Sequence, residues 1–379
     1  SSVYVGLEKV ASILSAVPLG IEHMEEVHAA VKSSSGNGYD EEYTMKHLFE
    51  TPGAGVGDKA TKASLSYGNP LRDLISQHVR SEIFTKASGD EIDPDAFLKA
   101  LESSDVQIYW PGSDAWNGSS LPVITFDPES GAHTNIGYKL VLNDDGTRRV
   151  EEVVVDEEMA AQRPVWVVNR NSDAEFTSLE MLRREDPDWS EGGGAIIIEP
   201  QKQTGTKGSS VVRSLILKDF TMKRNYDSWF AGASEFFVKV GAVENFTAVT
   251  EAEMKLYNPS VTDFMIVVKR SQVGVSQDFN AILMSDWAQW SMDSEGNKEG
   301  IDWYAFMITE DDGGTKTEWT TKAKVYVESK SYGFEISIPL NSRDDVVWRG
   351  RLSSRWLEAN DDLEASFGDV DLTFEVVEY

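Results

Sequence analysis

The chain has 379 residues, enough for two or three domains at the usual size of about 150 residues each. Its composition, 40% hydrophobic and 26% charged, is typical of a globular protein with a packed core. The formal net charge of −29 disfavours nucleic acid and an anionic membrane surface as partners. There is no cysteine, which excludes disulfides, thiolate metal ligands and a cysteine nucleophile. No apolar run reaches the roughly 18 residues that a transmembrane helix needs.

The first hundred residues carry the periodicity of amphipathic helices. Apolar residues recur at helical spacing over 3–17 and again over 21–31. Asp40 is a predicted N-cap for a short helix that ends near Phe49, and a further helix starts after Pro70. Asp93 before Pro94 is typical of a helix start, because proline fits the first helical position. We therefore predict a helical domain over residues 1–103.

From Val106 the pattern changes to strands. Short segments rich in β-formers lie at 106–110, 122–126, 165–168 and 195–198. Residues 138–141 and 149–155 flank Asn143-Asp144-Asp145-Gly146, which predicts a hairpin because an Asp-Gly step supplies the positive φ of a tight turn. These segments predict a mixed β domain over residues 104–200. The Gly-, Lys-, Ser- and Thr-rich run 201–210 is the predicted linker.

Residues 211–379 read as an antiparallel β-sandwich. The strand-like segments are Leu215–Met222, Glu235–Val240, Asp263–Lys269, Tyr304–Thr309, Ala323–Glu328, Phe334–Ile338 and Leu372–Val377. Their spacing and alternation favour two packed sheets over a parallel βαβ array. The fold class is therefore α+β, with an N-terminal helical domain, a mixed β middle segment and a C-terminal antiparallel β-sandwich.

Several catalytic signatures are absent from the sequence. His23 and His28 are five residues apart, roughly 140° around a helix, so they cannot bind one metal as an i, i+4 pair would. The glycine-rich stretch 53–61 lacks the contiguous Gly-Lys-Ser/Thr of a phosphate loop. No Gly-x-Ser-x-Gly nucleophile motif occurs either. We infer that these histidines are ordinary surface or core residues.

Acidic clusters in the C-terminal region fit a weak calcium site. They comprise Glu310, Asp311 and Asp312, then Asp344 and Asp345, and finally Asp361 and Asp362. Calcium takes six to eight oxygen ligands, and loops at one end of a sandwich can bring such oxygens together. Aspartate also favours turns, so solvated acidic loops are the alternative interpretation.

Tryptophans concentrate in the same region and suggest a binding surface. Trp287, Gln289 and Trp290 form the densest cluster near a predicted loop, and Trp229 is a further candidate. Exposed aromatic rings on a rigid sheet can stack on sugars or anchor a partner protein. Packing of the same rings into the core is the alternative.

Three stretches of the chain together resemble uncharacterised, predicted secreted or lipid-anchored bacterial proteins with domain-of-unknown-function labels. The stretches are the helical run that ends in Gly38-Tyr39-Asp40, the motifs between Val106 and Asn169 (Val106–Pro111, Trp116-Asn117-Gly118, Pro122–Pro128 and Pro164–Asn169), and Tyr226–Gly232 followed by Glu235 and later by Ile308–Asp312. That group has no assigned activity. The resemblance therefore implies export and a modular layout, and it transfers no catalytic residue.

The first residues, Ser1-Ser2-Val3, leave two interpretations open: removal of an export signal, with a lipid anchor on the removed segment, or an arbitrary boundary. We expect an exported protein that is periplasmic, on the cell surface or secreted. The leading hypothesis is a non-enzymatic binding or surface-assembly module whose sandwich engages a glycan or a surface protein, with calcium as a possible ion and no firm cofactor. The alternative is a carboxylate-dependent hydrolase of glycans or peptides with a structural calcium. In a third interpretation the helical domain docks to a membrane or envelope partner.

Overall fold

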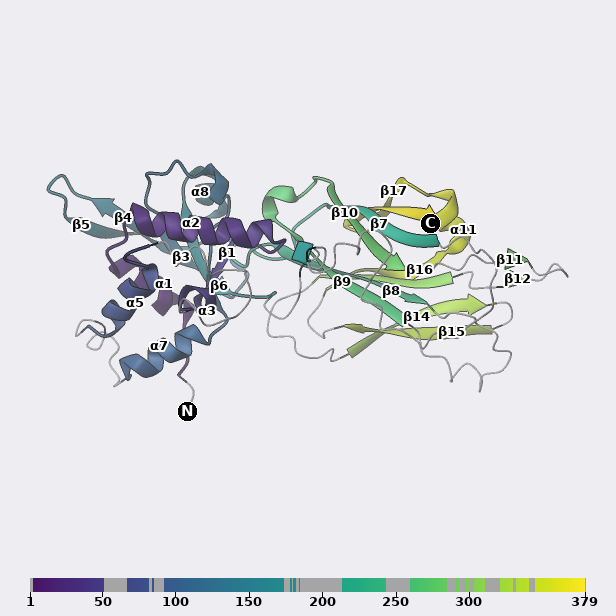
Figure 1. Ribbon diagram of the computed structural model, residues 1–379, viewed down its shortest axis with the longest axis horizontal. Coiled ribbons are helices and arrows are strands. Elements are labelled where there is room, and N and C mark those ends of the chain that lie inside the picture. The colour runs from purple at the N-terminus through teal and green to yellow at the C-terminus, as the bar shows by residue number, and fades with distance from the viewer. Residues whose placement is uncertain are drawn as a thin grey trace. The chain divides into compact units, whose positions relative to one another are not determined.

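The computed structural model describes residues 3–50, 67–81, 84, 92–173, 178, 180–181, 184, 213–242, 260–284, 291–292, 298–299, 303–310, 321–329, 332–340 and 345–378. The chain divides into two compact units (Figure 1). Unit 1 consists of residues 1–174, 227–233 and 269–271, and unit 2 of residues 175–226, 234–268 and 272–379. Helices come first and antiparallel sheets last, so the predicted α+β class is confirmed. The predicted linker at 201–210 and the strand predicted at 195–198 lie outside the described residues.

Unit 1 contains six helices among its described residues: α1 (Leu7–Ala16), α2 (Ile21–Gly36), α3 (Met45–Leu48), α5 (Leu71–Val79), α7 (Pro94–Glu102) and α8 (Glu157–Gln162). The helix start at Asp93 is confirmed, since its side chain accepts a hydrogen bond from the Asp95 N–H. The predicted N-cap at Asp40 is wrong. Residues after Asp40 first form a short strand, and Thr44 caps α3 by accepting from the His47 N–H at 3.2 Å.

The sheet of unit 1 has six strands. They are β1 (Glu42–Thr44), β2 (Val106–Tyr109), β3 (Val123–Phe126), β4 (Asn135–Leu142), β5 (Arg148–Val155) and β6 (Val165–Arg170), in the order β1-β2-β6-β3-β4-β5. Only the β3–β6 pair is parallel. The predicted hairpin joins β4 to β5, and Gly146 adopts the positive φ of 80° that the turn requires.

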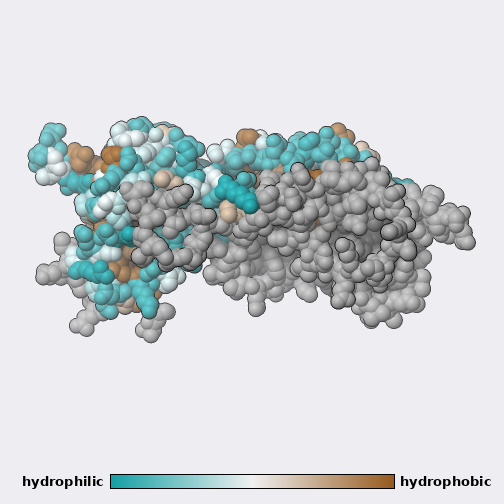
Figure 2. Space-filling model, in the orientation of Figure 1, coloured by the Kyte–Doolittle hydropathy of each residue, from teal (hydrophilic) through white to brown (hydrophobic). Residues whose placement is uncertain are grey.

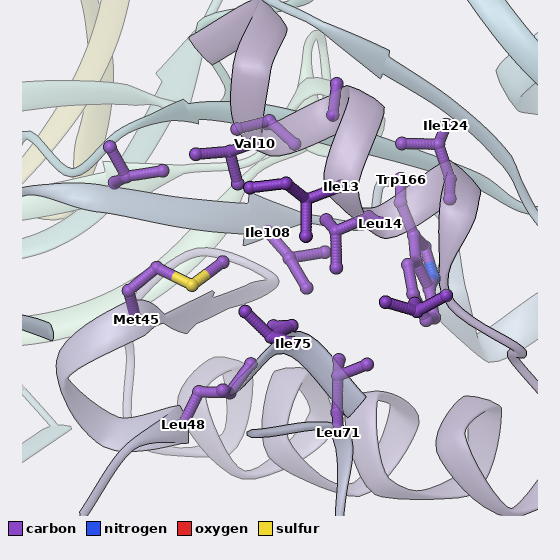
Figure 3. Close-up of a cluster of buried hydrophobic side chains, with 14 of the residues drawn as sticks. Val10, Ile13, Leu14, Met45, Leu48, Leu71, Ile75, Ile108, Ile124 and Trp166 are labelled. Atoms are coloured by element: carbon purple, nitrogen blue, oxygen red, sulfur yellow. The ribbon is translucent and has the colours of Figure 1, made fainter. Parts of the chain in front are cut away.

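Helices and strands of unit 1 share one hydrophobic core. Figure 3 shows Val10, Ile13 and Leu14 of α1 near side chains of α3, α5 and the sheet, among them Ile108 and Trp166. The boundary expected between residues 103 and 104 therefore falls inside this core. Because successive residues of a strand point to opposite faces, the other sheet face buries a second cluster: Tyr109, Val123, Val155, Val165, Val167, Trp229 and Phe230.

Unit 2 is the predicted antiparallel sandwich. One sheet has the order β10-β7-β18-β17, from β10 (Gln277–Met284), β7 (Arg213–Met222), β18 (Val370–Glu378) and β17 (Leu363–Phe367). The other has the order β16-β13-β8-β9, from β16 (Asp345–Ser353), β13 (Trp303–Glu310), β8 (Ser234–Ala242) and β9 (Ser260–Val268). Both sheets contribute buried side chains to one cluster, which includes Phe220, Phe236, Phe306 and Phe374. Strands β14 (Thr321–Ser329) and β15 (Tyr332–Leu340) form a hairpin, as do the two-residue strands β11 (Ser291–Met292) and β12 (Lys298–Glu299), and α11 (Ser354–Ala359) follows β16.

The sequence pattern indicates fewer strands than unit 2 contains. It missed β10, in which Asn280 has a positive φ of 49° and the register to β7 shifts twice, so that the alternation of the strand is broken. It also missed β16, whose first residue is Asp345, a residue expected in an acidic loop. Within the described residues, no helix combines the length and the apolar character needed to cross a membrane.

Candidate functional site

Polar side chains are buried where β1 meets the rest of the unit 1 sheet. Asp40, Glu41 and Glu42 enter or begin β1, which pairs with β2, and β2 in turn pairs with β6. Beside them lie Gln107, Asn169, Asn171 and Asp173 on or just after β2 and β6, and all seven residues are buried. Buried polar groups need partners, since each unpaired one costs free energy. The partners of this cluster therefore show what it does.

Asp40 binds the segment 227–233. Its carboxylate accepts the N–H of Glu41 at 2.7 Å and the N–H of Ala233 at 2.8 Å. Burial raises the pKa of Asp40 to about 6, although the two backbone hydrogen bonds pull it down. Gly232 has a φ of +109°, and a Cβ on this residue would lie 2.6 Å from Asp40 Oδ2. Glycine is thus required here both for its backbone conformation and for space.

Asn169 binds the same segment from the sheet. Its amide nitrogen donates to the carbonyls of Phe230 at 2.9 Å and Ala231 at 3.2 Å. Trp229, proposed from sequence as a ligand-binding ring, is only 1% exposed and packs in the core of unit 1. Its indole N–H donates to the His133 carbonyl at 3.0 Å. For Trp229, the core interpretation is the one that the structure shows.

Glu41 holds a short 3-10 helix, η1 (Ser113–Ala115). Its carboxylate accepts the N–H of Gly112 at 3.1 Å, the N–H of Ser113 at 3.1 Å and the Ser113 hydroxyl at 3.0 Å. Unpaired N–H groups at a helix start are a favourable environment for a carboxylate. The Glu41 carboxylate therefore occupies the position at the start of η1 that an anionic ligand would otherwise take.

Glu42 and Asp173 form a buried carboxyl pair. The carboxyl group of Asp173 lies beside that of Glu42 and accepts a hydrogen bond from the Asn171 amide at 2.9 Å, and Asn171 also donates to Gln107 at 2.7 Å. Burial raises the pKa of Asp173, while these hydrogen bonds and the charge of His47 oppose that rise. Glycosidase carboxyl pairs lie roughly 5–10 Å apart around the substrate. Glu42 and Asp173 instead contact each other.

The two helical histidines also have partners within unit 1. Nδ1 of His23 accepts the Gly20 N–H at 2.9 Å, and its Nε2 lies 2.9 Å from the Asn69 carbonyl. His28 packs against Trp110 and Trp116, with ring centroids 5.5 and 5.4 Å away. In the described part of the chain, no group of three or more metal-ligating side chains is placed to hold an ion.

The acidic residues expected to bind calcium do not all meet. Glu310, which is fully buried, and Asp345, which is exposed, are cross-strand neighbours at one end of the β13–β16 pair. Asp361 and Asp362 follow α11, beyond the opposite end of β16, and nine residues of strand span roughly 27 Å. Asp311, Asp312 and Asp344 lie outside the described residues, as do Trp287, Gln289 and Trp290.

Asp361 and Asp362 bind groups of the protein itself. Asp361 Oδ1 accepts the N–H of Val376 at 2.7 Å. Asp362 pairs with Lys218 at 2.5 Å and has a positive φ of 56°. These contacts fit the interpretation of this cluster as an acidic turn.

The hairpin of β4 and β5 carries a surface that no sequence pattern indicated. Leu142, Val150 and Val154 are 60%, 46% and 66% exposed, and the register Leu142↔Arg148 and Leu140↔Val150 places them on one face of the sheet. Leu140 on that face is buried in the core under the helices. The alternating pattern around the Asp-Gly turn predicted the hairpin, but exposure of its apolar face depends on where the helices end. Searches of protein families, of curated proteins and of solved structures found no match to this chain.

Proposed function

We propose that this chain is an exported, non-enzymatic module that binds or assembles at the cell surface. The observation that supports it is the group of exposed aliphatic side chains on the β4–β5 hairpin, Leu142, Val150 and Val154. Single exposed apolar residues are ordinary, but several on one face of a rigid hairpin are typical of interaction sites. The hairpin belongs to a six-stranded sheet with a packed core on both faces, so the surface is presented without prior ordering.

Binding to isolated cell envelopes tests this proposal. We expect the purified chain to sediment with envelopes in a saturable manner, and Leu142→Thr/Val154→Thr to bind more weakly because it removes apolar contact area. Leu363→Thr is the matched control, since Leu363 is 55% exposed but lies on β17 of unit 2. Equal binding by both variants, or none by the parent chain, would contradict the proposal. Fractionation of cells that express the full-length gene tests export, and a purely cytosolic signal would contradict it.

Calcium belongs to this proposal as an ion bound at the Glu310–Asp345 end of the sandwich. Its support is the cross-strand pairing of these two carboxylates, next to the acidic residues of the flanking segments. Carboxylate oxygens are the ligands that calcium prefers. A glycan or a surface protein is the proposed ligand of the module.

A carboxylate-dependent hydrolase is the second candidate, and the Glu42–Asp173 pair is the observation in its favour. Two carboxyl groups in direct contact can share a proton and divide the roles of acid and base, which suits a peptide hydrolase better than a glycosidase. A panel of glycan and peptide substrates distinguishes the two functions. Turnover that disappears in Asp173→Asn while the fold is retained would establish the hydrolase and exclude the non-enzymatic proposal.

A further inference from the structure

Strand β5 is an edge strand of the unit 1 sheet. The strand order ends at β5, and no strand in the described part of the chain pairs with its outer side. Figure 1 shows the β4–β5 hairpin extending from the sheet, and Figure 2 shows apolar surface there. An exposed edge offers unpaired N–H and C=O groups to any other strand, and natural proteins usually block it with charges.

The hairpin register shows which backbone groups of β5 point outward. The N–H of Asn143 donates to the Thr147 carbonyl at 2.8 Å, so these two residues form a hydrogen-bonded pair. Hydrogen-bonded and non-bonded pairs alternate along an antiparallel ladder, and the β4–β5 register runs without a shift. It follows that Arg149 and Glu151 bond to β4. The N–H and C=O groups of Arg148, Val150 and Glu152 then point to the outer edge.

The charges on this edge are self-complementary. The strand begins Arg148-Arg149-Val150-Glu151-Glu152. When this segment is paired antiparallel with a copy of itself, its positive charges face the negative charges of the copy. With a two-fold axis at Val150, each Arg149 faces a Glu151 of the second copy and each Arg148 faces a Glu152. The two Val150 side chains face each other at the centre. In this register the outward backbone groups of facing residues also match as hydrogen-bonded pairs.

Neighbouring registers lack this complementarity. A two-fold axis perpendicular to a sheet must pass beside one residue and its own copy. An axis at Arg149 would place two arginines opposite each other, and an axis at Glu151 or Glu152 would place two glutamates opposite each other. Like charges directly across a strand pair are destabilising. Among the registers centred on residues 148–152, the charges therefore favour the one centred on Val150.

We propose that β5 pairs antiparallel with β5 of a second copy of this chain, so that the two unit 1 sheets become continuous. The proposal rests on the function proposed above and names a second copy as the assembly partner. The backbone hydrogen bonds and the aliphatic side chains beside them supply the affinity, and the charges fix the register.

The existing side-chain contacts of β5 are compatible with this pairing. Arg149 bonds to Glu151 of its own strand at 2.6 Å, and both side chains are largely exposed. Exchanging that partner for the Glu151 of a second copy costs little, because exposed ion pairs contribute little in either place. Arg148 already donates to the carbonyls of Val17 and Leu19, so Arg149 and Glu151 are the charges that are available to fix the register.

Charge reversal tests the register. The purified chain is expected to sediment at twice the monomer mass at about 100 µM and physiological salt, which also screens the net charge of −29. Arg149→Glu and Glu151→Arg each place like charges across the axis, and each is expected to raise the dimer Kd at least about tenfold. An equimolar mixture of the two variants restores opposite charges at both positions and is expected to dimerise. A monomeric parent chain, or a mixture no better than its components, would overturn the proposal.

Disulfide trapping tests the position of the axis in a chain that has no cysteine of its own. Val150→Cys places two thiols across the axis on Cα atoms about 5.5 Å apart, within the range of a disulfide. Val154→Cys is the control, since residue 154 is more exposed, 66% against 46%, yet would face no equivalent residue. We expect rapid covalent dimers from the first variant and slow ones from the second. Faster dimer formation by Val154→Cys would mean that the disulfides form by random collision, at a rate set by side-chain exposure, and would reject the pairing.

The outcomes separate this inference from the proposed function. Envelope binding by a chain that stays monomeric would reject the β5 pairing and leave the binding module intact. Dimerisation without envelope binding would support the β5 pairing and reject the proposed binding at the cell surface.

Discussion

Replacing Gly232 by alanine should lower the free energy of unfolding of unit 1 by more than the addition of one methyl group suggests. The residue has a φ of +109°, and strain of this kind costs about 1–3 kcal/mol for a residue with a side chain. Its new Cβ would lie 2.6 Å from Asp40 Oδ2, closer than real contacts allow, so the carboxylate must move. That movement breaks the 2.8 Å hydrogen bond from Ala233, and a bond to a charged group contributes about 1.5–3 kcal/mol. The two effects together cost roughly 2.5–6 kcal/mol.

Gly131→Ala is the matched control for this prediction. Gly131 has a φ of +75°, but no atom lies within 4 Å of its Cβ position, so only the backbone strain applies. Urea unfolding followed by circular dichroism and by tryptophan fluorescence gives both free energies of unfolding. We expect Gly232→Ala to lose about 2 kcal/mol more than Gly131→Ala. Equal losses would refute the reasoning that Asp40 and its hydrogen bonds hold the 227–233 segment in place.

Three further predictions concern pH, the buried tryptophan and calcium. Burial raises the pKa of Glu26 to about 7 and that of Asp40 to about 6, so the folded state holds these protons more tightly than the unfolded chain. Their contribution to stability is therefore present at about pH 4 and is lost as the pH rises to 7. Glu26→Gln should reduce the dependence of the free energy of unfolding on pH, measured by urea titration. Trp229→Ala should lower the free energy of unfolding by about 3–5 kcal/mol in the same assay, because a buried ring is lost; a change below about 1 kcal/mol would contradict its place in the core. Millimolar calcium should raise the melting temperature over EDTA by several degrees, magnesium should not, and Asp345→Asn should reduce the shift. No shift would leave the acidic residues as solvated turns.

Local signals in the sequence predicted the local structure correctly. Asp93 before Pro94 marked a helix start because the cap and the ring act within a few residues. Gly146 marked the hairpin turn for the same reason. Asp40 carried a similar cap signal, but its carboxylate binds Ala233, a residue 193 positions further along the chain. No pattern within a few residues of Asp40 reveals that partner.

Packing over long distances also explains the other differences. The helices of residues 1–103 use Ile108, Ile124 and Trp166 of the following strands as their core, so composition alone could not place a boundary at residue 103. The acidic clusters near Asp345 and Asp361 are close in sequence, yet β16 and α11 separate them along the sandwich. Trp229 gave no sign of its burial, because its partners come from β2, β3, β5 and β6.

The β5 edge combines both kinds of information. The order of charges from Arg148 to Glu152 is readable in the sequence, but it has no meaning until the strand is known to be an edge. In a central strand the same residues would face neighbours already fixed by the fold. At an edge, the outward N–H and C=O groups can form hydrogen bonds with another strand, and the charged side chains determine which strand can pair with them. A strand of another sequence brings no side chains of opposite charge to Arg149 and Glu151, whereas a copy of β5 brings both. The same five residues therefore keep other strands away from the edge and recognise a copy of β5. Reversing one charge should remove the recognition of the copy and leave the edge still charged.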